Sequence, residues 1–181
     1  KAQENFTDPD SRIMKRAGGG FDPSYNAQTA VDEAAHIIVA AELDNTAPDA
    51  NWLLPMIDAI QENLGALPAL GLADAGYRSE DNLRDAPIDL VVALGREGKQ
   101  HAAIDAARLP HTAAMAAKMQ TAAGRAAYRK RKWIAEPPNG WIKSVLGFRQ
   151  FSLRGLERVR AEWKLVCAAL NLRRMASLVP A

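Results

Sequence analysis

The sequence has 181 residues, of which 48% are hydrophobic and 24% are charged, with a formal net charge of +2 at pH 7. This composition suits one globular domain with a buried core, and it excludes a chain that is disordered throughout. No stretch approaches the ~20 apolar residues of a membrane span, and no charged-then-apolar leader opens the chain, so we expect no membrane association and a cytoplasmic location.

Charge is divided unevenly along the chain. Residues 1–110 contain nine Lys and Arg against eighteen Asp and Glu, whereas residues 111–181 contain fourteen against three. The acidic part suits divalent cations, and the basic part suits a phosphate backbone, whose affinity for proteins comes mainly from such cations. The alternative interpretation is that the two parts neutralise each other within the fold.

The N-terminal part of the chain predicts a loop followed by a hairpin and a helix. Residues 1–24, with three consecutive glycines and Pro23, have the composition of a loop. YNAQTAVDE and HIIVAAELD then predict adjacent antiparallel strands. From Asp49, which stands at a capping position, apolar residues recur at helical spacing until Gly65 ends the helix.

The middle of the chain predicts two further strands with a helix between them. The apolar run in ALGLADAGY predicts a strand that ends at Asp74, and Ser79 opens a brief helix over SEDNLRD. IDLVVAL predicts another buried strand. The order strand, strand, helix, strand, helix, strand predicts a mixed α/β layer whose sheet is at least partly parallel.

The C-terminal part is helical and basic. Residue propensities predict a helix from Thr112 to Lys132, interrupted only by Gly124, and Pro137 and Pro138 are expected to end or bend it. A last helix is predicted from apolar residues spaced by three and four: Leu153, Leu156, Val159, Trp163, Val166 and Leu170. The single cysteine, Cys167, lies on this stripe, which favours a small buried side chain over a reactive one.

Two carboxylates are candidates for a catalytic or metal-binding role. Asp74 follows a predicted strand, where open α/β sheets bind ligands, although Asp before Ala-Gly is also an ordinary turn residue. Glu136 is a solitary acid among cations, so it either pairs with them or holds a cation; these neighbours are Arg131, Lys132, Lys143 and Arg149. Three His and one Cys at unrelated positions form no familiar zinc site, so a metal here should be Mg²⁺ or Mn²⁺.

Several motifs occur in an order that resembles a known family. They are NFTDPDSRIM, YNAQTAVDE, LADAGYRSEDNL, AEPPNGWIK and LGFRQFSLRGL, with Tyr128 and Arg131 before the fourth. Nearly the whole chain resembles the DDE transposases of bacterial insertion sequences, in the branch with a Tyr-Arg-Glu-Lys motif. Tyr128, Arg131, Glu136 and Lys143 match that motif, with six residues between Glu136 and Lys143 as expected and one residue more than usual between Arg131 and Glu136.

The resemblance implies an enzyme that cleaves DNA and transfers strands. Asp74 and Glu136 would be the second and third catalytic carboxylates and would hold two Mg²⁺ (or Mn²⁺) ions, supported by Tyr128, Arg131 and Lys143. The expected partners are transposon-end DNA, target DNA and a second copy of the chain in a homodimer. The expected DNA-binding residues are Arg129, Lys130, Arg131, Lys132, Lys143 and Arg149. Trp141 and Phe148 are either stacking surfaces for bases or core residues, and core packing is favoured.

The resemblance also implies an RNase H-like mixed sheet with flanking helices, lacking its first strand, plus C-terminal helices. Residues 1–24 would be a loop that follows a missing upstream insertion, and residues 25–181 would be the C-terminal portion of the DDE domain. The first catalytic aspartate is then expected upstream of Lys1. Three early acids could replace it, but they look like turn or strand-end residues: Asp8, Asp10 and Asp32.

A chain that lacks one of three ligand carboxylates should bind metal poorly and cleave DNA slowly or not at all. Two other classes of function therefore stay open. The chain could bind transposon ends without cleaving them, since the basic part is intact. It could also be an inert remnant whose sheet has an unpaired edge.

Overall fold

The computed structural model describes residues 4–15, 19–95 and 103–179. The chain divides into two compact units. Unit 1 consists of Lys1–Ala47 and Pro137–Ala181, and unit 2 consists of Pro48–Glu136. None of the helices in the described ranges is long and apolar enough to span a bilayer.

Unit 1 begins with a short β-hairpin. Strand β1 (Arg12–Lys15) pairs antiparallel with β2 (Phe21–Ser24). The prediction of a loop over residues 1–24 is therefore wrong for these two strands. Gly19 and Gly20 between them have φ values of 92° and 81°, a conformation that glycine adopts at little cost and that lets the chain reverse.

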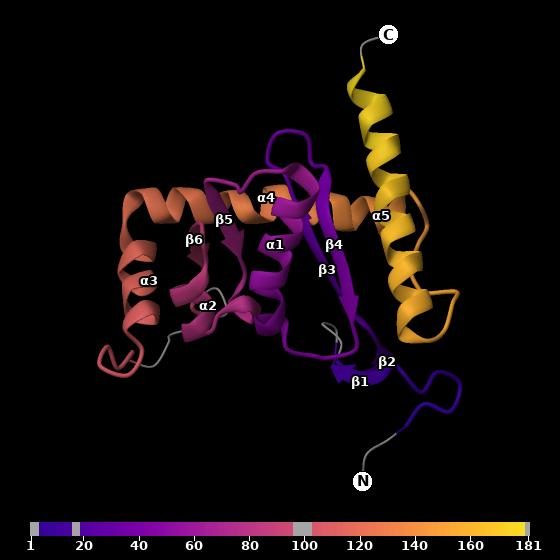
Figure 1. The fold of residues 1–181 in the computed structure, drawn as a ribbon, viewed down its shortest axis with the longest axis horizontal. Helices are drawn as coiled ribbons and strands as arrows, with labels where there is room; N and C mark the ends of the chain where they lie inside the picture. Colours follow the sequence, from indigo (N-terminus) through magenta and orange to yellow (C-terminus); the bar gives the residue numbers. More distant parts are fainter. Residues whose placement is uncertain (1–3, 16–18, 96–102, 180–181) are drawn as a thin grey trace. The chain divides into compact units, whose positions relative to one another are not determined.

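The second hairpin of unit 1 confirms the predicted pair of antiparallel strands. Strand β3 (Asn26–Val31) pairs with β4 (Ile38–Asp44), as Figure 1 shows. Asp32 closes the connection, because its carboxylate accepts hydrogen bonds from the backbone N–H of Ala35 (2.8 Å) and of Ile37 (2.5 Å). These bonds satisfy backbone donors that have no partner in the strand ladder.

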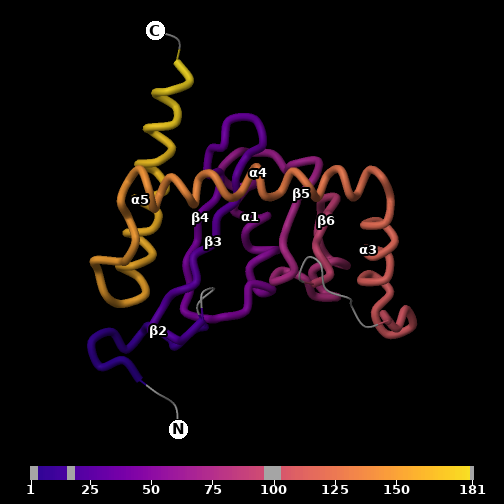
Figure 2. The backbone as a smooth tube through the Cα atoms, turned by 180° about the vertical axis from the view of Figure 1, so that it is seen from behind, coloured from indigo at the N-terminus to yellow at the C-terminus, as the bar shows by residue number. Residues whose placement is uncertain are grey.

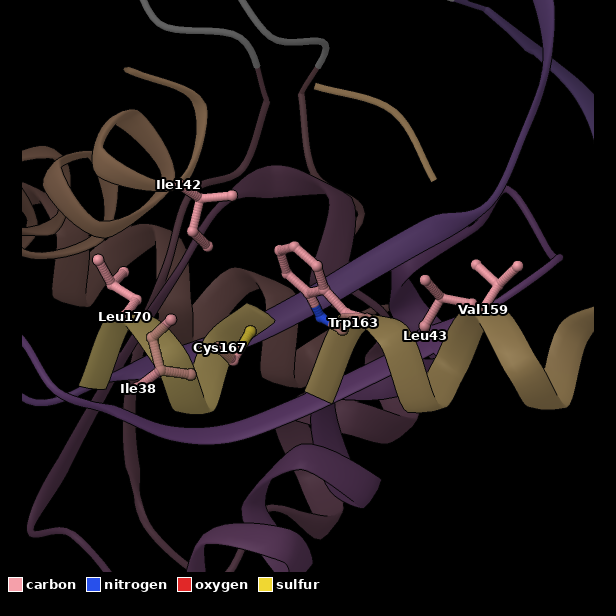
Figure 3. Packing of buried hydrophobic residues seen from close by; sticks show 7 residues of the cluster. All are labelled: Ile38, Leu43, Ile142, Val159, Trp163, Cys167 and Leu170. Atoms are coloured by element: carbon pink, nitrogen blue, oxygen red, sulfur yellow. The ribbon is translucent and has the colours of Figure 1, made fainter. Parts of the chain in front are cut away.

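Helix α5 (Leu156–Leu178) packs on β4 and forms the core of unit 1. Figure 3 shows the buried cluster, which consists of Ile38, Leu43, Ile142, Val159, Trp163, Cys167 and Leu170. The predicted apolar stripe is thus confirmed for Val159, Trp163 and Leu170. The prediction is wrong for Leu153, which precedes the helix and is 47% exposed.

Cys167 is only 3% exposed, and burial raises the pKa of its thiol from 9.0 to about 12. Because the unfolded chain loses this proton first, the stabilising contribution is complete below pH 9 and is lost as the pH rises towards 12. We expect the free energy of unfolding to fall by about 1 kcal/mol between pH 8 and pH 10. Urea denaturation at these pH values measures the change, and the fall should be smaller in a Cys167→Ala variant; an equal fall in both proteins would contradict the assignment.

Unit 2 contains the remaining elements in the predicted order. They are the 3₁₀ helix η1 (Asp49–Trp52), α1 (Leu53–Leu64), β5 (Leu70–Ala73), η2 (Ala75–Tyr77), α2 (Glu80–Asp85), β6 (Asp89–Val92), α3 (Pro110–Gln120) and the larger part of α4 (Ala122–Ser144). Strands β5 and β6 pair in parallel, which confirms that part of the chain's sheet structure is parallel. The core between them and the helices includes Leu53, Ile57, Leu90, Val92 and Met115.

Local signals in unit 2 behave as predicted with one exception. Gly65 ends α1 in the left-handed conformation, with φ of 69°, and Ser79 accepts a hydrogen bond from the N–H of Asn82 (3.0 Å) as the N-cap of α2. The capping position predicted for Asp49 is wrong. Pro48 is the N-cap residue of η1, and no side chain caps that end.

The helix predicted from Thr112 to Lys132 is two helices. Figure 2 shows α3 turning sharply into α4, and the break lies at Thr121 rather than at Gly124. The Thr121 hydroxyl accepts a hydrogen bond from the N–H of Gly124 (2.9 Å), which starts the new helix. A Cβ atom on Gly124 would overlap the carbonyl oxygen of Lys118, so this corner requires glycine.

Helix α4 continues through Pro137 and Pro138 to Ser144, so of the two predicted effects of the prolines, an end of the helix is wrong. Neither proline can donate the helical hydrogen bond to the carbonyl four residues earlier. Pro138 is fully buried, so its ring gains packing contacts at this point of the helix. Glu136 therefore lies within a helix and not after one.

The described strands form three two-stranded sheets, in the orders β1-β2, β3-β4 and β5-β6. The chain thus has mixed α/β structure with helices and small sheets. Both parallel and antiparallel pairing occur, as predicted, but in separate sheets.

Candidate active site

Asp74 lies where the sequence predicts it, directly after β5 in unit 2. It is the N-cap of η2, and its Oδ1 atom accepts a hydrogen bond from the N–H of Gly76 (2.9 Å). The side chain is half-buried. One carboxylate oxygen is thus held by the backbone, and this fixes the direction of the other oxygen.

The structure places a second acid, Asp49, beside Asp74. A Cβ atom on Gly76 would lie 2.6 Å from Oδ2 of Asp49 and 3.1 Å from Oδ1 of Asp74. Sequence reasoning missed Asp49 because it lies on η1, one strand and one helix earlier in the chain. The glycine after Asp74 was the available signal, since any larger residue there would displace both carboxylates.

The pKa of Tyr77 reflects its burial and the negative charges of Asp49 and Asp74. Burial raises the pKa of its phenol well above the usual value, and the negative charges of Asp49 and Asp74 raise it further. A tyrosine next to two carboxylates stays protonated at physiological pH. The surroundings of Asp74 are therefore negatively charged and partly shielded from water, which are conditions that favour binding of a cation.

Glu136 is exposed on α4. Within the described part of the chain, the ion pairs of 4.0 Å or less do not include Glu136. The interpretation that Glu136 neutralises its basic neighbours therefore gains no support. Arg125, Arg129, Lys132 and Glu136 are all exposed and recur at spacings of four, three and four, so one face of α4 presents three cations and this carboxylate.

Tyr128 and Arg131 form a pair on α4. The Arg131 guanidinium carbon lies 5.5 Å from the centre of the Tyr128 ring, and both side chains are half-buried. The Nε atom of Arg131 is buried without a hydrogen-bond partner in the described structure. A buried donor of this kind is costly, and an anionic ligand would satisfy it.

The other predicted DNA-binding residues are solvent-facing. Arg129, Lys130 and Lys132 are exposed on α4, and Lys143 and Arg149 are exposed in unit 1. Trp133 of α4 is also 57% exposed, and sequence reasoning missed it. Its position next to Lys132 could have suggested it.

Trp141 and Phe148 pack against the core of unit 1, as the favoured interpretation predicted. The Trp141 ring lies 5.9 Å from the His36 ring and 5.3 Å from the Arg174 guanidinium carbon. The Phe148 and Phe151 rings are 5.3 Å apart. Neither aromatic residue is a free surface for a nucleic-acid base.

Asp8 and Asp10 hold the start of α5. Asp8 accepts hydrogen bonds from the N–H of Gly155 (3.1 Å) and from the Tyr25 hydroxyl (2.8 Å), and Asp10 accepts one from the N–H of Leu156 (2.9 Å). Their negative charges also suit the positive end of the helix dipole. Together with Asp32, which closes the β3–β4 hairpin, these acids have structural contacts that explain their presence.

Glu80 connects α2 to α3. Its carboxylate accepts hydrogen bonds from the N–H of His111 (2.6 Å), the N–H of Thr112 (3.0 Å) and the Thr112 hydroxyl (2.7 Å). These bonds cap the N-terminus of α3, which leads through the Gly124 corner into α4. The segment after Asp74 is thereby connected to α3, the helix that comes directly before α4 and Glu136.

No group of three His, Cys, Asp or Glu side chains that could hold a metal ion occurs within residues 4–15, 19–95 and 103–179. The donors that the chain offers near Asp74 are carboxylate oxygens, which suit Mg²⁺ and Mn²⁺. The chemistry of these donors fits such an ion, although two described acids do not complete a site.

Comparison with known proteins identifies a family. A family model described as the transposase DDE domain matches residues 3–172. Searches of curated proteins and of solved structures return no match. Transposases of this family cleave DNA and use divalent metal ions, generally Mg²⁺. Because the match covers nearly the whole sequence, the chain belongs to the transposase DDE-domain family.

Proposed function

We propose that this chain catalyses metal-dependent cleavage and transfer of DNA strands at the ends of a bacterial insertion sequence, in the Tyr-Arg-Glu-Lys branch of its family. Asp74 and Glu136 are the second and third catalytic carboxylates. The observation that carries the proposal is the placement of Asp74, whose carboxylate is held by Gly76 at the end of β5. The RNase H-like arrangement over residues 25–181 is part of the same proposal.

Asp74 and Glu136 would hold two Mg²⁺ or Mn²⁺ ions. When bound, such ions activate a water or a 3′-hydroxyl and stabilise the departing oxygen. Asp74 contributes a carboxylate whose orientation its bond to Gly76 restricts. Glu136 contributes an exposed carboxylate from α4.

The first of the three catalytic carboxylates is proposed to lie outside this sequence, upstream of Lys1. The hydrogen bonds of Asp8, Asp10 and Asp32 support this proposal, because each carboxylate already satisfies backbone N–H groups. Moving any of them to a metal would leave those donors without a partner.

Transposon-end and target DNA are the proposed partners, bound by a homodimer of the chain. The exposed cations of α4 would contact phosphates, as would Lys143 and Arg149. Arg131 would contribute its buried, unpartnered Nε, held in place by the Tyr128 ring. An anionic phosphate would satisfy that donor.

In a form of the protein that cleaves DNA, cleavage of the protein backbone by bound Fe²⁺ tests the metal site. With Fe²⁺, ascorbate and peroxide, hydroxyl radicals cut the chain next to the ion, and mass spectrometry locates the cuts. We expect cuts around residues 74–76 and around residue 136, both suppressed by excess Mg²⁺, since one metal pair would contact both carboxylates.

Asp74→Asn should abolish both sets of cuts. Asp58→Asn, a matched change at an exposed acid of α1, should leave them intact. Cuts near Asp74 without cuts near Glu136 would contradict the shared site. The absence of any Mg²⁺-sensitive cut at millimolar Fe²⁺ would contradict metal binding altogether.

A second candidate function is DNA binding without cleavage. It is favoured by the charge of residues 111–181, where fourteen Lys and Arg face three Asp and Glu. Steep loss of DNA binding with salt, in a chain that never cleaves DNA even with its upstream segment restored, would identify this function. A chain with no cooperative thermal unfolding would instead be an inert remnant.

A further inference from the structure

Helix α3 begins without a capping side chain from its own segment. Its N-cap residue is Leu109, and Pro110 follows at the first helical position, where it has no N–H to donate. The next two N–H groups, those of His111 and Thr112, donate to the Glu80 carboxylate of α2, which lies beside α3 (Figure 1). The hydroxyl of Thr112, a residue only 4% exposed, adds the third bond. The start of α3 is therefore held by a side chain of α2.

Helix α2 is in turn fixed to the segment that carries Asp74. The side-chain amide of Asn82, a residue 6% exposed, donates hydrogen bonds to the carbonyl oxygens of Tyr77 (2.8 Å) and Ala50 (2.6 Å). Tyr77 ends η2, and Asp74 is the N-cap of that helix. A buried amide with two backbone acceptors is held in one orientation. Asn82 and Glu80, two residues apart on α2, thus connect the turn of Asp74 to the start of α3.

The remainder of α3 is fixed on β6, the strand that pairs with β5. The Lys118 ammonium donates to the carbonyl oxygen of Leu90 (2.7 Å) and forms an ion pair with Asp89. The N–H of Val92 donates to the sulfur atom of Met115 (3.5 Å). Helix α3 is therefore held at two places, and its direction depends on the carboxylate cap at its N-terminus.

Helix α4 takes its direction from α3 through a hydrogen-bonded corner. The N–H of Thr121 donates to the carbonyl oxygen of Lys118 (3.1 Å), and the N–H of Arg125 donates to that of Thr121 (3.1 Å). Glu136 lies about 21 Å along α4 from Ala122, the first residue of this helix. A tilt of about 10° at the corner would therefore move Glu136 by roughly 4 Å, which is the separation of the two metal ions in such a site.

We infer that Glu80 is a positioning residue of the proposed active site. Its carboxylate holds α3, and through α3 the part of α4 that carries Glu136, at a fixed place relative to Asp74. The inference rests on the proposed function, since it requires Asp74 and Glu136 to hold the same metal ions. Glu80 itself contacts neither DNA nor metal, because its oxygens already accept from three donors. A displacement of about 1 Å can slow an enzyme on the order of 100-fold, so this helix cap affects catalysis as well as stability.

Distances between spin labels test the positioning without metal or DNA. In a Cys167→Ala background, labels at Glu62→Cys on α1 and Arg129→Cys on α4 report the place of α4 within unit 2, because both positions are exposed. Double electron–electron resonance should give one narrow distance distribution for the chain with Glu80 intact. Glu80→Ala should broaden the distribution by a factor of about two or more, because three hydrogen bonds at the start of α3 are lost.

Asp81→Ala is the matched control, because Asp81 is the other acid in the first turn of α2 and pairs with Arg84 of the same helix. It should leave the distance distribution unchanged. Thr112→Val removes only the hydroxyl bond and should broaden the distribution less; added to Glu80→Ala, it should have no further effect. If thermal unfolding shows that Glu80→Ala does not fold, the smaller broadening expected of Thr112→Val decides the question.

Backbone cleavage by bound Fe²⁺, in a form of the protein that cleaves DNA, separates positioning from a purely structural cap. In Glu80→Ala, cuts around residues 74–76 should persist, because Asp74 keeps its bond to Gly76, whereas cuts around residue 136 should weaken about tenfold or more. DNA strand cleavage should fall about tenfold or more in kcat with KM for DNA within about twofold, because the cations of α4 remain. Asp81→Ala should match the unchanged protein in every respect.

Two results would overturn the inference. One is a narrow, unchanged distance distribution in Glu80→Ala. The other is a broadened distribution with both sets of cuts and the rate of DNA cleavage intact, which would make Glu80 a structural cap only. An unchanged protein without Mg²⁺-sensitive cuts would instead contradict the proposed function, and the spin-label distances would still decide whether Glu80 places α4.

Discussion

Asp74→Asn or Glu136→Gln is expected to lower Mg²⁺-dependent DNA strand cleavage by a factor of about 1,000 or more in a form of the protein that cleaves DNA. The amides keep the size of the side chains and remove the charge that holds the metal ions. DNA binding should change little, because losing a negative charge lowers repulsion of phosphate. The measurement is cleavage of an end-labelled duplex with transposon ends, together with a mobility-shift assay on the same duplex.

Asp58→Asn should leave cleavage unchanged, and Lys143→Ala should lower it less than either amide, because a lysine contacts phosphate and holds no metal. Cleavage by Asp74→Asn within tenfold of the unchanged enzyme would contradict the assignment. The 181-residue chain alone should not cleave above background. If it cleaves robustly, Asp49 becomes the first candidate for the third ligand, since it lies beside Asp74.

Replacing Arg129, Lys130, Arg131 and Lys132 by alanine is expected to weaken DNA binding at least 100-fold at low salt. Each phosphate contact contributes about 0.9 to the slope of log K against log salt, so losing three or four contacts should flatten that slope by about 3. Fluorescence anisotropy with a labelled duplex, titrated at several salt concentrations, measures both quantities. An unchanged slope would mean that these residues form only a solvated face.

A triple variant that replaces Arg129, Lys130 and Lys132 and keeps Arg131 is easier to interpret, because the Arg131 side chain packs on Tyr128. Arg129, Lys130 and Lys132 are exposed, so their replacement leaves no cavity in the core. Arg154, Arg158 and Arg173 are three exposed cations of unit 1 and provide a control with the same loss of charge. Equal effects of the two triple variants would show that net charge, and not the face of α4, governs binding.

Several features of this protein were determined by the sequence alone. The β3–β4 strands, the N-cap at Ser79, the end of α1 at Gly65 and the core stripe of α5 were all predictable. Each depends on residues close together in the chain: alternating apolar side chains, a hydroxyl at a helix start, or a glycine that tolerates positive φ. The transposase family was also predictable, because the order of motifs along the chain is a property of the sequence and needs no contact between them.

Only the tertiary structure decided the surroundings of the candidate site. Glu136 lies inside α4, which continues through Pro137 and Pro138, and Pro138 is fully buried there. Asp8 and Asp10 cap the start of α5, which follows them by more than a hundred residues, and Asp49 meets Asp74 across Gly76. Contacts between residues far apart in the chain arise from packing, and no local pattern encodes them.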